Sequence, residues 1–353
     1  MRLSKSIPEP ANTSAVPKTD RVGNSDWQPG ASLKVMKTRA TLLARIRDYF
    51  ARNGVLEVDT PALSRFGCTD PAIESFRTEY RGPSRIDGLP LYLHTSPEFF
   101  MKRLLAAGYG PLYQLAHVFR DGEWGTLHNP EFMMLEWYRP GMVHHALMDE
   151  IDDLLAFVLD GFFDYQPANR ISYRQWFLEA TGLDPWVDGV EAFRRFAEHK
   201  LETPPVGMDG ADLDTWLDLL VTHWLAPRCA DQLLFVFDYP ASQAALARIC
   251  PVDDRVADRF ELFMGDMELA NGYVELTDAA EQRRRIDADL DKRQRLGRDV
   301  RPWDKRLLEA LEHGLPDCAG VALGVERLHM VLDATGDIRD VMTFAFEENH
   351  EQP

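Results

Sequence analysis

The sequence predicts an α+β domain built on a mainly antiparallel β-sheet flanked by helices, and two hairpin signatures carry this prediction. In the first, an apolar run ends at Arg120, crosses a glycine-containing loop and returns in near-alternation through residues 132–138. In the second, residues 260–276 contain two strand-like runs that break at Gly265. Segments with apolar residues at helical spacing surround these hairpins, and they predict the flanking helices.

Composition and charge limit the classes of protein that fit. The 353 residues are 45% hydrophobic, enough to bury one large core or two ordinary ones. The 39 basic and 57 acidic residues give a net charge of −18, which disfavours non-specific binding to a phosphate backbone, so tRNA is not an expected partner. There is no secretory signal and no apolar run near the roughly 18 residues of a membrane helix, so we expect a cytoplasmic protein without membrane contact. The four cysteines lack the spacing of a zinc site or a disulfide framework.

The N-terminal part predicts a tail followed by a helix. Residues 1–30 are rich in Pro, Ser, Thr and Asn and have no periodicity, so we expect a disordered tail there and a single folded domain over residues 31–353. Apolar residues then recur at helical spacing up to Phe50, and Gly54 marks the end of that helix. A short strand leads from it into Pro61.

A second helix is predicted immediately after a short strand at residues 91–94. In the string T-S-P-E that follows, Ser96 has the side chain of an N-cap, Pro97 suits the first helical position and Glu98 suits the first turn. On these grounds alone, the segment has a structural role.

Residues 144–257 predict mostly helices, with a strand that ends in a turn at residues 238–243. His144 and His145 are adjacent, so they point in different directions and make a poor ligand pair. We expect both to be exposed to solvent.

The first hairpin gathers side chains that suit a nucleotide. Arg120 carries a planar fork that can grip a phosphate. His128 and Asn129 offer hydrogen bonds, and Phe132 offers a flat face on which a ring can stack. Taken alone, the same residues also fit an ordinary hairpin with a surface arginine.

The second hairpin carries three glutamates among apolar residues, Glu261, Glu268 and Glu275. Carboxylates on central strands are costly to bury unless they face a cation. Magnesium with nucleotide phosphates is one such cation, and an amine substrate is another. The alternative is that these carboxylates lie on a solvated face of the sheet.

The C-terminal part predicts a charged helix over residues 277–299, and such a charge run is usually a solvated face, although it could dock a negatively charged partner. A further helix ends near Gly314. The chain then alternates as a strand and enters a helix at Glu326, next to Arg327. Glycines before an arginine at a helix start suit a phosphate or a purine.

These segments resemble the signature motifs of the class II aminoacyl-tRNA synthetases. The string G-V-L-E-V-D-T-P, with the helix before it, is similar to the first motif, which forms the dimer interface in that family. The second motif, F-R-x-E with a loop and then H-x-x-x-F, is matched by Phe119, Arg120, His128 and Phe132. In this sequence Gly122 stands where the family has glutamate, and Glu123 lies one residue later.

The string G-V-A-L-G-V-E-R resembles the third motif, G-x-G-x-G-x-E/D-R. It begins at Gly320 and ends at Arg327, and Ala322 replaces the middle glycine. An added methyl group beside the substrate should reshape the amino-acid site, so the substrate need not be plain L-lysine.

The resemblance implies an ATP-dependent, AMP-forming ligase with the class II catalytic fold. It implies that Arg120, Glu268 and Arg327 are catalytic. The implied ATP site consists of Arg120, Asp121, Gly122, His128, Asn129, Phe132, Glu268, Leu269, Gly324 and Arg327. The implied substrate contacts are Ser96, Pro97, Glu98, Glu136, Tyr138, Glu275 and Ala322. Glu261 and Glu268 would hold magnesium, so ATP and Mg²⁺ are the expected cofactors.

Within this family, the lysyl-tRNA synthetases are the most similar. There the position of Glu275 pairs with the side-chain ammonium of the substrate, beside the position of Tyr138. Those enzymes carry an anticodon-binding domain before the first motif, and in its place we expect only the short tail.

In that difference and in Ala322, the sequence resembles a branch of the family. Members of this branch activate (R)-β-lysine as an adenylate and ligate it to a lysine side chain of translation elongation factor P. The resemblance therefore implies lysine or β-lysine as substrate, elongation factor P as partner and a homodimer. Two alternatives stay open. One is a truncated lysyl-tRNA synthetase that acts on tRNA, and the other is an inactive regulatory paralogue.

Overall fold

The computed structural model describes residues 27–83, 86, 88–162, 164–203, 205, 207–208, 210–229 and 232–346. Of the tail predicted over residues 1–30, residues 1–26 lie outside these ranges.

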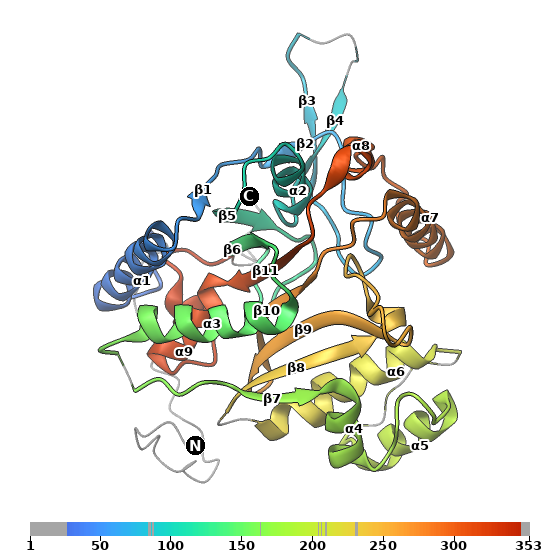
Figure 1. Cartoon of the computed structure of the whole chain (residues 1–353). Coiled ribbons are helices and arrows are strands. Elements are labelled where there is room, and N and C mark those ends of the chain that lie inside the picture. The colour runs from blue at the N-terminus through green and yellow to red at the C-terminus, as the bar shows by residue number, and fades with distance from the viewer. Residues whose placement is uncertain are drawn as a thin grey trace.

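An eight-stranded sheet forms the centre of the described chain (Figure 1). Its strands lie in the order β1 (Leu56–Glu57), β5 (Leu112–Phe119), β6 (Glu131–Pro140), β11 (Cys318–Gly324), β10 (Met267–Val274), β9 (Val256–Met264), β8 (Leu233–Pro240) and β7 (Asn169–Ser172). Neighbouring strands are antiparallel, except that β1 pairs with β5 and β7 pairs with β8 in parallel. The predicted α+β class with a mainly antiparallel sheet is therefore confirmed.

Both predicted hairpins are present. β5 and β6 pair directly, and the loop between them holds residues 120–130. β9 and β10 are joined by a tight turn at Gly265, whose φ of 61° is a left-handed conformation that glycine adopts readily.

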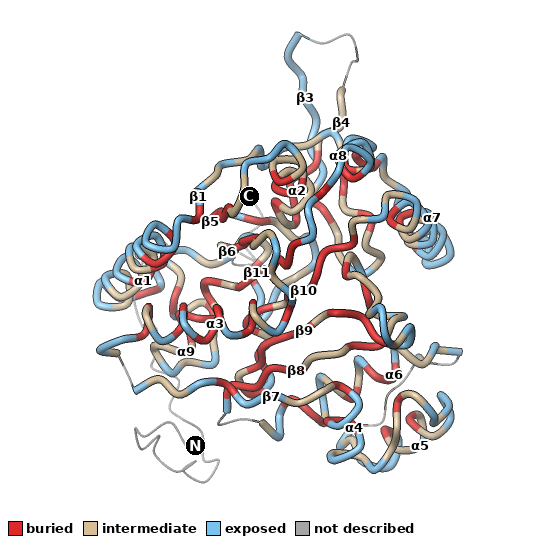
Figure 2. Tube along the Cα trace, in the orientation of Figure 1, coloured by how far each residue is buried: buried red, intermediate tan, exposed pale blue. Residues whose placement is uncertain are grey.

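One face of the main sheet carries the larger hydrophobic core. The helices α1 (Leu33–Arg52), α3 (His144–Leu159) and α9 (Val325–Asp333) cover this face (Figure 1). The strands contribute the buried side chains of Leu135, Trp137, Phe235, Phe260, Leu262 and Val321, and Figure 2 shows these strands as buried. Because side chains alternate along a strand, the residues between them point to the other face.

Helices cover the opposite face at its two ends. Beside β8 and β7, the helices α4 (Tyr173–Thr181), α5 (Val190–Lys200) and α6 (Leu213–Leu220) pack through Trp176 and Trp216. Beside β5, the helices α2 (Glu98–Ala106) and α8 (Arg306–Gly314) pack through Met101 and Leu307. Between these groups lies the central part of the face, on β6, β11, β10 and β9, where polar side chains lie beside a small apolar cluster that includes Met134 and Ala322.

A three-stranded sheet, ordered β2 (Leu63–Ser64), β4 (Leu89–Leu93) and β3 (Arg77–Tyr80), projects from one end of the molecule (Figure 1). The charged helix α7 (Ala279–Arg295) contacts α8. Short helical turns are η1 (Val221–Leu225), η2 (Ala226–Cys229), η3 (Ala241–Gln243) and η4 (Ile338–Val341). No helix in the part of the chain that the structure describes is both long and apolar enough to cross a bilayer.

The first two helices begin at or near the predicted positions. α1 starts at Leu33 and ends before Gly54, as predicted. α2 starts at Glu98 with Pro97 as its N-cap residue, so the predicted roles of Ser96 and Pro97 were wrong by one position. Ser96 still satisfies the helix start, because its Oγ accepts the N–H of Glu98 at 3.0 Å.

Two predictions of solvent exposure were wrong. His145 is exposed, but His144 is buried at the start of α3, with Nε2 3.7 Å from Asp238 Oδ1. Adjacent residues of a helix point in different directions, so only one of the pair faces the sheet. In the charged helix α7, Arg293 is fully buried because it donates to both carboxylate oxygens of Glu74, at 2.7 and 2.9 Å.

Candidate active site

The central strands bring several of the predicted site residues to one face of the sheet. Residues that pair directly in an antiparallel sheet point to the same side. Two rows of paired residues cross this face, one of Tyr138, Gly320 and Tyr273, and the other of Glu136, Ala322, Asn271 and Glu261. Apart from Gly320 and Ala322, the two rows are polar, whereas the opposite face of the same strands is core.

A β-bulge adds Glu268 to this face. Strict alternation from Asn271 would place Glu268 on the core side of β10. The register shifts between Glu268 and Ala270, so that Glu268 pairs with Phe263, which lies on the same face as Glu261. Burial raises the pKa of Glu261, and the nearby charge of Glu268 raises it further.

Three glutamates, Glu98, Glu136 and Glu275, form an acidic cluster at one end of this face. Glu136 is 2% exposed, and its two oxygens accept hydrogen bonds from Tyr138 Oη at 2.6 Å and from Ser96 Oγ at 2.8 Å. Burial raises the pKa of Glu136 to about 7, with a further rise from the charge of Glu98.

Glu275 is the most enclosed member of the acidic cluster. Its side chain is 1% exposed, and Oε2 lies 2.5 Å from the ammonium nitrogen of Lys102. Burial raises the pKa of Glu275, and the Lys102 charge opposes that rise. Within the described chain, neither oxygen of Glu275 has a well-aligned hydrogen-bond donor. A buried carboxylate in this condition suits a cationic ligand.

The acidic cluster depends on a glycine and a second tyrosine. Tyr273 Oη donates to Glu98 Oε1 at 2.6 Å. A Cβ atom at Gly320 would lie 2.5 Å from Glu275 Oε1 and would also collide with the ring of Tyr138. Gly320 therefore leaves the space in which these two side chains meet.

In the first hairpin, Arg120 lies over the aromatic ring of Phe132. The guanidinium carbon of Arg120 lies 5.2 Å from the ring centroid of Phe132. Its Nε is buried and has no hydrogen-bond partner among the described residues, so it is available to an anion. Gly122, which replaces the family glutamate, has a φ of 82°, a backbone conformation that strains other residues. Glu123 lies 3.6 Å from Arg120 Nη1.

Arg327 connects the first hairpin to the second. Its Nη1 donates to the backbone oxygen of Glu268 at 2.6 Å, and its Nη2 lies 2.9 Å from His128 Nε2. Burial lowers the pKa of His128, and the charge of Arg327 lowers it further, so His128 stays neutral beside the guanidinium. The structure thus places residues from all three segments side by side.

Some residues implied for the ATP site are already engaged through their side chains. Asn129 Nδ2 donates to the oxygen of Glu131 at 2.6 Å, and its Oδ1 accepts the N–H of Phe346 at 2.8 Å. Leu269 is buried in the larger core on the other face. A nucleotide could therefore contact Asn129 and Leu269 only through their backbone atoms. Gly324 is the N-cap residue of α9, and Asp121 is exposed beside Arg120.

Glu261 and Glu268 fit a magnesium ion that also binds phosphate. Both present carboxylate oxygens on one face, and the Glu268 side chain is 41% exposed. Glu261 accepts hydrogen bonds from Arg259 at 2.5 Å and from Tyr239 at 2.7 Å. The described residues contain no set of three or more His, Cys, Asp or Glu side chains placed to hold a metal. The remaining ligands would have to come from phosphate and water, which is how magnesium usually binds beside nucleotides.

The sequence did not single out three residues of this site, namely Lys102, Tyr273 and Arg259. Lys102 follows Glu98 by four residues in an otherwise apolar stretch, a spacing that places both on one face of a helix. Arg259 precedes Glu261 by two residues and so shares its face of β9. These spacings are the signals that could have identified Lys102 and Arg259.

A family model described as tRNA synthetases class II (D, K and N) matches residues 26–348. The chain belongs to the class II tRNA synthetase family. The family relationship predicted from the three motifs is therefore confirmed.

Within the family, several curated relatives of similar length carry the same name. A Photorhabdus laumondii protein named elongation factor P–(R)-beta-lysine ligase is 48% identical over 322 residues, which are 91% of this chain and 98% of that protein. Proteins of the same name from Vibrio cholerae and Salmonella typhi are 48% and 47% identical, with 92% and 91% of this chain covered and 98% of each relative. The branch of the family that the sequence resembles is thus confirmed.

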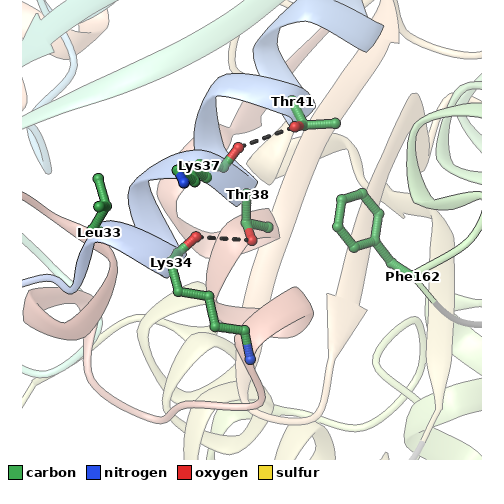
Figure 3. A pocket seen from close by; sticks show the side chains of 6 residues that line it. All are labelled: Leu33, Lys34, Lys37, Thr38, Thr41 and Phe162. Carbon is green, nitrogen blue, oxygen red and sulfur yellow. Dashed lines mark hydrogen bonds between the residues drawn. The ribbon is translucent and has the colours of Figure 1, made fainter.

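A surface cavity of about 460 Å³ lies on α1 and is separate from these residues (Figure 3). Its lining consists of Leu33, Lys34, Lys37, Thr38, Thr41 and Phe162. It contains no carboxylate and none of the residues implied for substrate or ATP, so the cavity carries no part of the candidate site.

Proposed function

We propose that this protein activates (R)-β-lysine with ATP and ligates it to a lysine side chain of translation elongation factor P. The acidic cluster carries the proposal, because buried carboxylates with unused hydrogen-bonding capacity suit a substrate that has two ammonium groups. The cluster lies on the same sheet face as Glu261 and Glu268. Relatives named for this reaction cover nearly the whole chain, which supports the identity of the substrate and the acceptor.

In the activation step, a carboxylate oxygen of β-lysine attacks the α-phosphorus of ATP and pyrophosphate leaves. The substrate carboxylate is already ionised at neutral pH, so this step needs no general base. It needs neutralisation of phosphate charge and in-line placement. We assign the α-phosphate to Arg120, whose Nε has no partner among the described residues, and the departing pyrophosphate to Arg327, which lies beside His128 of the same hairpin loop.

Magnesium would neutralise phosphate charge where it is bound, with Glu261 and Glu268 as its protein ligands. Arg259 and Tyr239 hold the Glu261 carboxylate in place by hydrogen bonds. Arg327 fixes the backbone of Glu268 at 2.6 Å. These contacts orient the Glu261 carboxylate and fix the backbone that carries Glu268 before any ligand binds.

In the transfer step, the nitrogen of the acceptor lysine attacks the carbonyl carbon of the adenylate, an amide forms and AMP leaves. The acceptor amine has an ordinary pKa of about 10.4, so it must first lose a proton. The net charge of −18 supports a protein acceptor over tRNA, since tRNA would have to approach a strongly acidic surface.

We further propose that two copies associate through residues 33–61, the region similar to the first class II motif. Leu33 and Leu56 are 73% and 48% exposed, and contact with a second copy would bury them. Light scattering of the wild type should give twice the mass of the chain, and Leu33→Asp should shift the protein towards the monomer.

The decisive experiment is incubation of the protein with ATP, magnesium, one lysine isomer and purified elongation factor P, followed by intact mass measurement. We expect elongation factor P to gain one lysyl group, with (R)-β-lysine preferred over L-lysine. Fragmentation should locate the modified lysine, and its replacement by arginine should abolish the mass gain. Labelling of tRNA in place of elongation factor P would reject the proposal.

A further inference from the structure

Lys102 lies one turn after Glu98 on α2 and directs its ammonium group into the acidic cluster. The side chain is 1% exposed, and Nζ lies 2.6 Å from Glu98 Oε1 and 2.5 Å from Glu275 Oε2. The ring centroid of Tyr273 is 5.6 Å from the same nitrogen. A buried ammonium group is costly unless charges surround it, so this position of Lys102 depends on the cluster.

The charges in this part of the site do not balance. Three carboxylates of the acidic cluster face one ammonium group, and no other cationic side chain of the described chain lies within ion-pair distance of them. The remaining titratable groups beside the cluster are Tyr138, Tyr273 and Cys318. Burial, followed by the neighbouring carboxylates, raises the pKa of each above its ordinary value, so these groups are neutral at pH 7. The pKa is raised to about 7 for Glu136 and to about 8 for Glu275, and a bound cation favours their ionised forms. With its three carboxylates ionised, the cluster together with Lys102 carries two negative charges.

An amino acid with two amino groups matches this charge. α-Lysine and β-lysine each carry two ammonium groups and one carboxylate at neutral pH. Once the carboxylate is joined to AMP, the two ammonium groups are the charges that remain on the aminoacyl part. Without Lys102, three carboxylates would face those two groups, and one carboxylate would stay unpaired in a buried place.

The geometry also separates the two oxygens of Glu275. Oε2 contacts Lys102, whereas Oε1 lies on the side of Gly320, where an added Cβ would come within 2.5 Å of it. Oε1 has no hydrogen-bond partner among the described residues, so it can accept a hydrogen bond from a ligand. Lys102 thus occupies one oxygen and holds the other towards the substrate.

We infer that Lys102 fixes the charge of the amino-acid site at two negative charges and thereby makes the site select an acid with two ammonium groups. This inference rests on the proposed function, since it concerns the same substrate. Lys102 acts through Glu98 and Glu275, so it is a specificity-determining residue that does not touch the reacting atoms.

The test is calorimetric binding of (R)-β-lysine, L-lysine and L-norleucine to the full chain without ATP, between pH 6 and pH 9. The wild type should bind L-lysine at least about tenfold more tightly than L-norleucine, which lacks the side-chain ammonium. Lys102→Met should weaken lysine binding about tenfold or more at pH 7, because loss of the Lys102 charge raises the pKa of Glu275 further and the ligand must then bind at the cost of ionising this carboxylate. The loss should diminish at pH 9, while ATP binding should stay within about twofold.

Two further variants make the result specific. Lys102→Gln keeps hydrogen-bonding groups without the charge and should behave like Lys102→Met. Arg103→Met is the matched control, because Arg103 is the next residue on α2, is 31% exposed and faces Asp304 at 3.4 Å. It should bind all three ligands like the wild type.

Wild-type selectivity in Lys102→Met or Lys102→Gln would overturn the inference, and so would a loss of ATP binding equal to the loss of lysine binding. A wild type that binds no lysine isomer would overturn it as well. If the wild type binds lysine but forms no pyrophosphate, the proposed function fails, while the binding comparison still decides the role of Lys102.

Discussion

Arg327 Nη2 lies 2.9 Å from His128 Nε2, although the two residues are 199 positions apart in the chain. The contact joins the loop of the first hairpin to the helix that follows β11. It places the two segments that are similar to the second and third family motifs around one site. A phosphate bound at the first hairpin would therefore lie close to Arg327.

The first prediction concerns Arg327. Arg327→Ala should lower the rate of lysine-dependent ATP–pyrophosphate exchange by about 100-fold or more, because a charge that stabilises the departing pyrophosphate is lost. Arg327→Lys should recover only part of the rate, since lysine cannot donate to Glu268 and the phosphate in the same geometry. Thermal unfolding should confirm that both variants are folded. An exchange rate like that of the wild type in Arg327→Ala would remove the residue from the site.

The second prediction concerns Glu275. Glu275→Gln should cost on the order of 3–5 kcal/mol in kcat/KM for lysine, because one partner of a buried ion pair is lost. The KM for ATP should change little, since Glu275 belongs to the acidic cluster and not to the phosphate side. Exchange kinetics with varied lysine and varied ATP separate the two effects. Unchanged lysine kinetics would mean that the substrate ammonium binds elsewhere.

The third prediction follows from Glu136, whose pKa is raised from 4.5 to about 7 by burial and then by Glu98. An ammonium group binds the ionised carboxylate, so kcat/KM for lysine should rise between pH 6 and pH 8. In Glu136→Gln the activity should be low and this rise should be smaller, because Glu275, whose pKa is raised to about 8, still ionises in the upper part of the range. A pH profile measured at saturating ATP tests the prediction, and an equal rise in the variant would assign it to another group.

Glu136 should also affect stability, which should fall with rising pH whereas the activity rises. Its pKa is higher in the folded protein than in the unfolded chain, so the folded state binds more protons between pH 4.5 and about 7. The free energy of unfolding should therefore fall as the pH rises through this range, by at most about 3 kcal/mol from this group. Urea unfolding at pH 5 and pH 8 should show a smaller difference in Glu136→Gln than in the wild type.

The fourth prediction concerns Gly320, where a Cβ atom would collide with Tyr138 and Glu275. Gly320→Ala should abolish detectable exchange and lower the free energy of unfolding by about 1–3 kcal/mol. Gly336→Ala is the matched control, because a Cβ there meets nothing within 4 Å. It should stay within about 0.5 kcal/mol of the wild type. Equal activity in both variants would show that the space at Gly320 is not needed.

Much of the fold could be predicted from sequence because local patterns determine its elements. The alternation along residues 132–138 and the break at Gly265 identified both hairpins, and the three motifs identified the strands on which they lie. The start of α2 was misplaced by one residue because Ser96 and Pro97 both suit the N-terminus of a helix. Sequence alone cannot decide which of them is the N-cap residue.

The parts of the site that escaped prediction depend on tertiary contacts. Glu268 reaches the site face through a β-bulge. The equal spacing of seven residues between Glu261, Glu268 and Glu275 did not indicate this bulge. Lys102 was missed because a lysine on a helix usually lies on the solvated side. Its role follows from the contact with Glu275, which lies far away in the chain. Arg293 was taken for part of a solvated face because its partner, Glu74, lies more than 200 residues away in the chain.

The most direct test of the whole account is ATP–pyrophosphate exchange by the wild-type protein with (R)-β-lysine, with L-lysine and with no amino acid. We predict exchange that requires a lysine isomer, needs magnesium and is fastest with (R)-β-lysine. Exchange that is absent with every isomer, or that proceeds equally without an amino acid, would contradict the claim that ATP and a diamino acid meet on this face of the sheet.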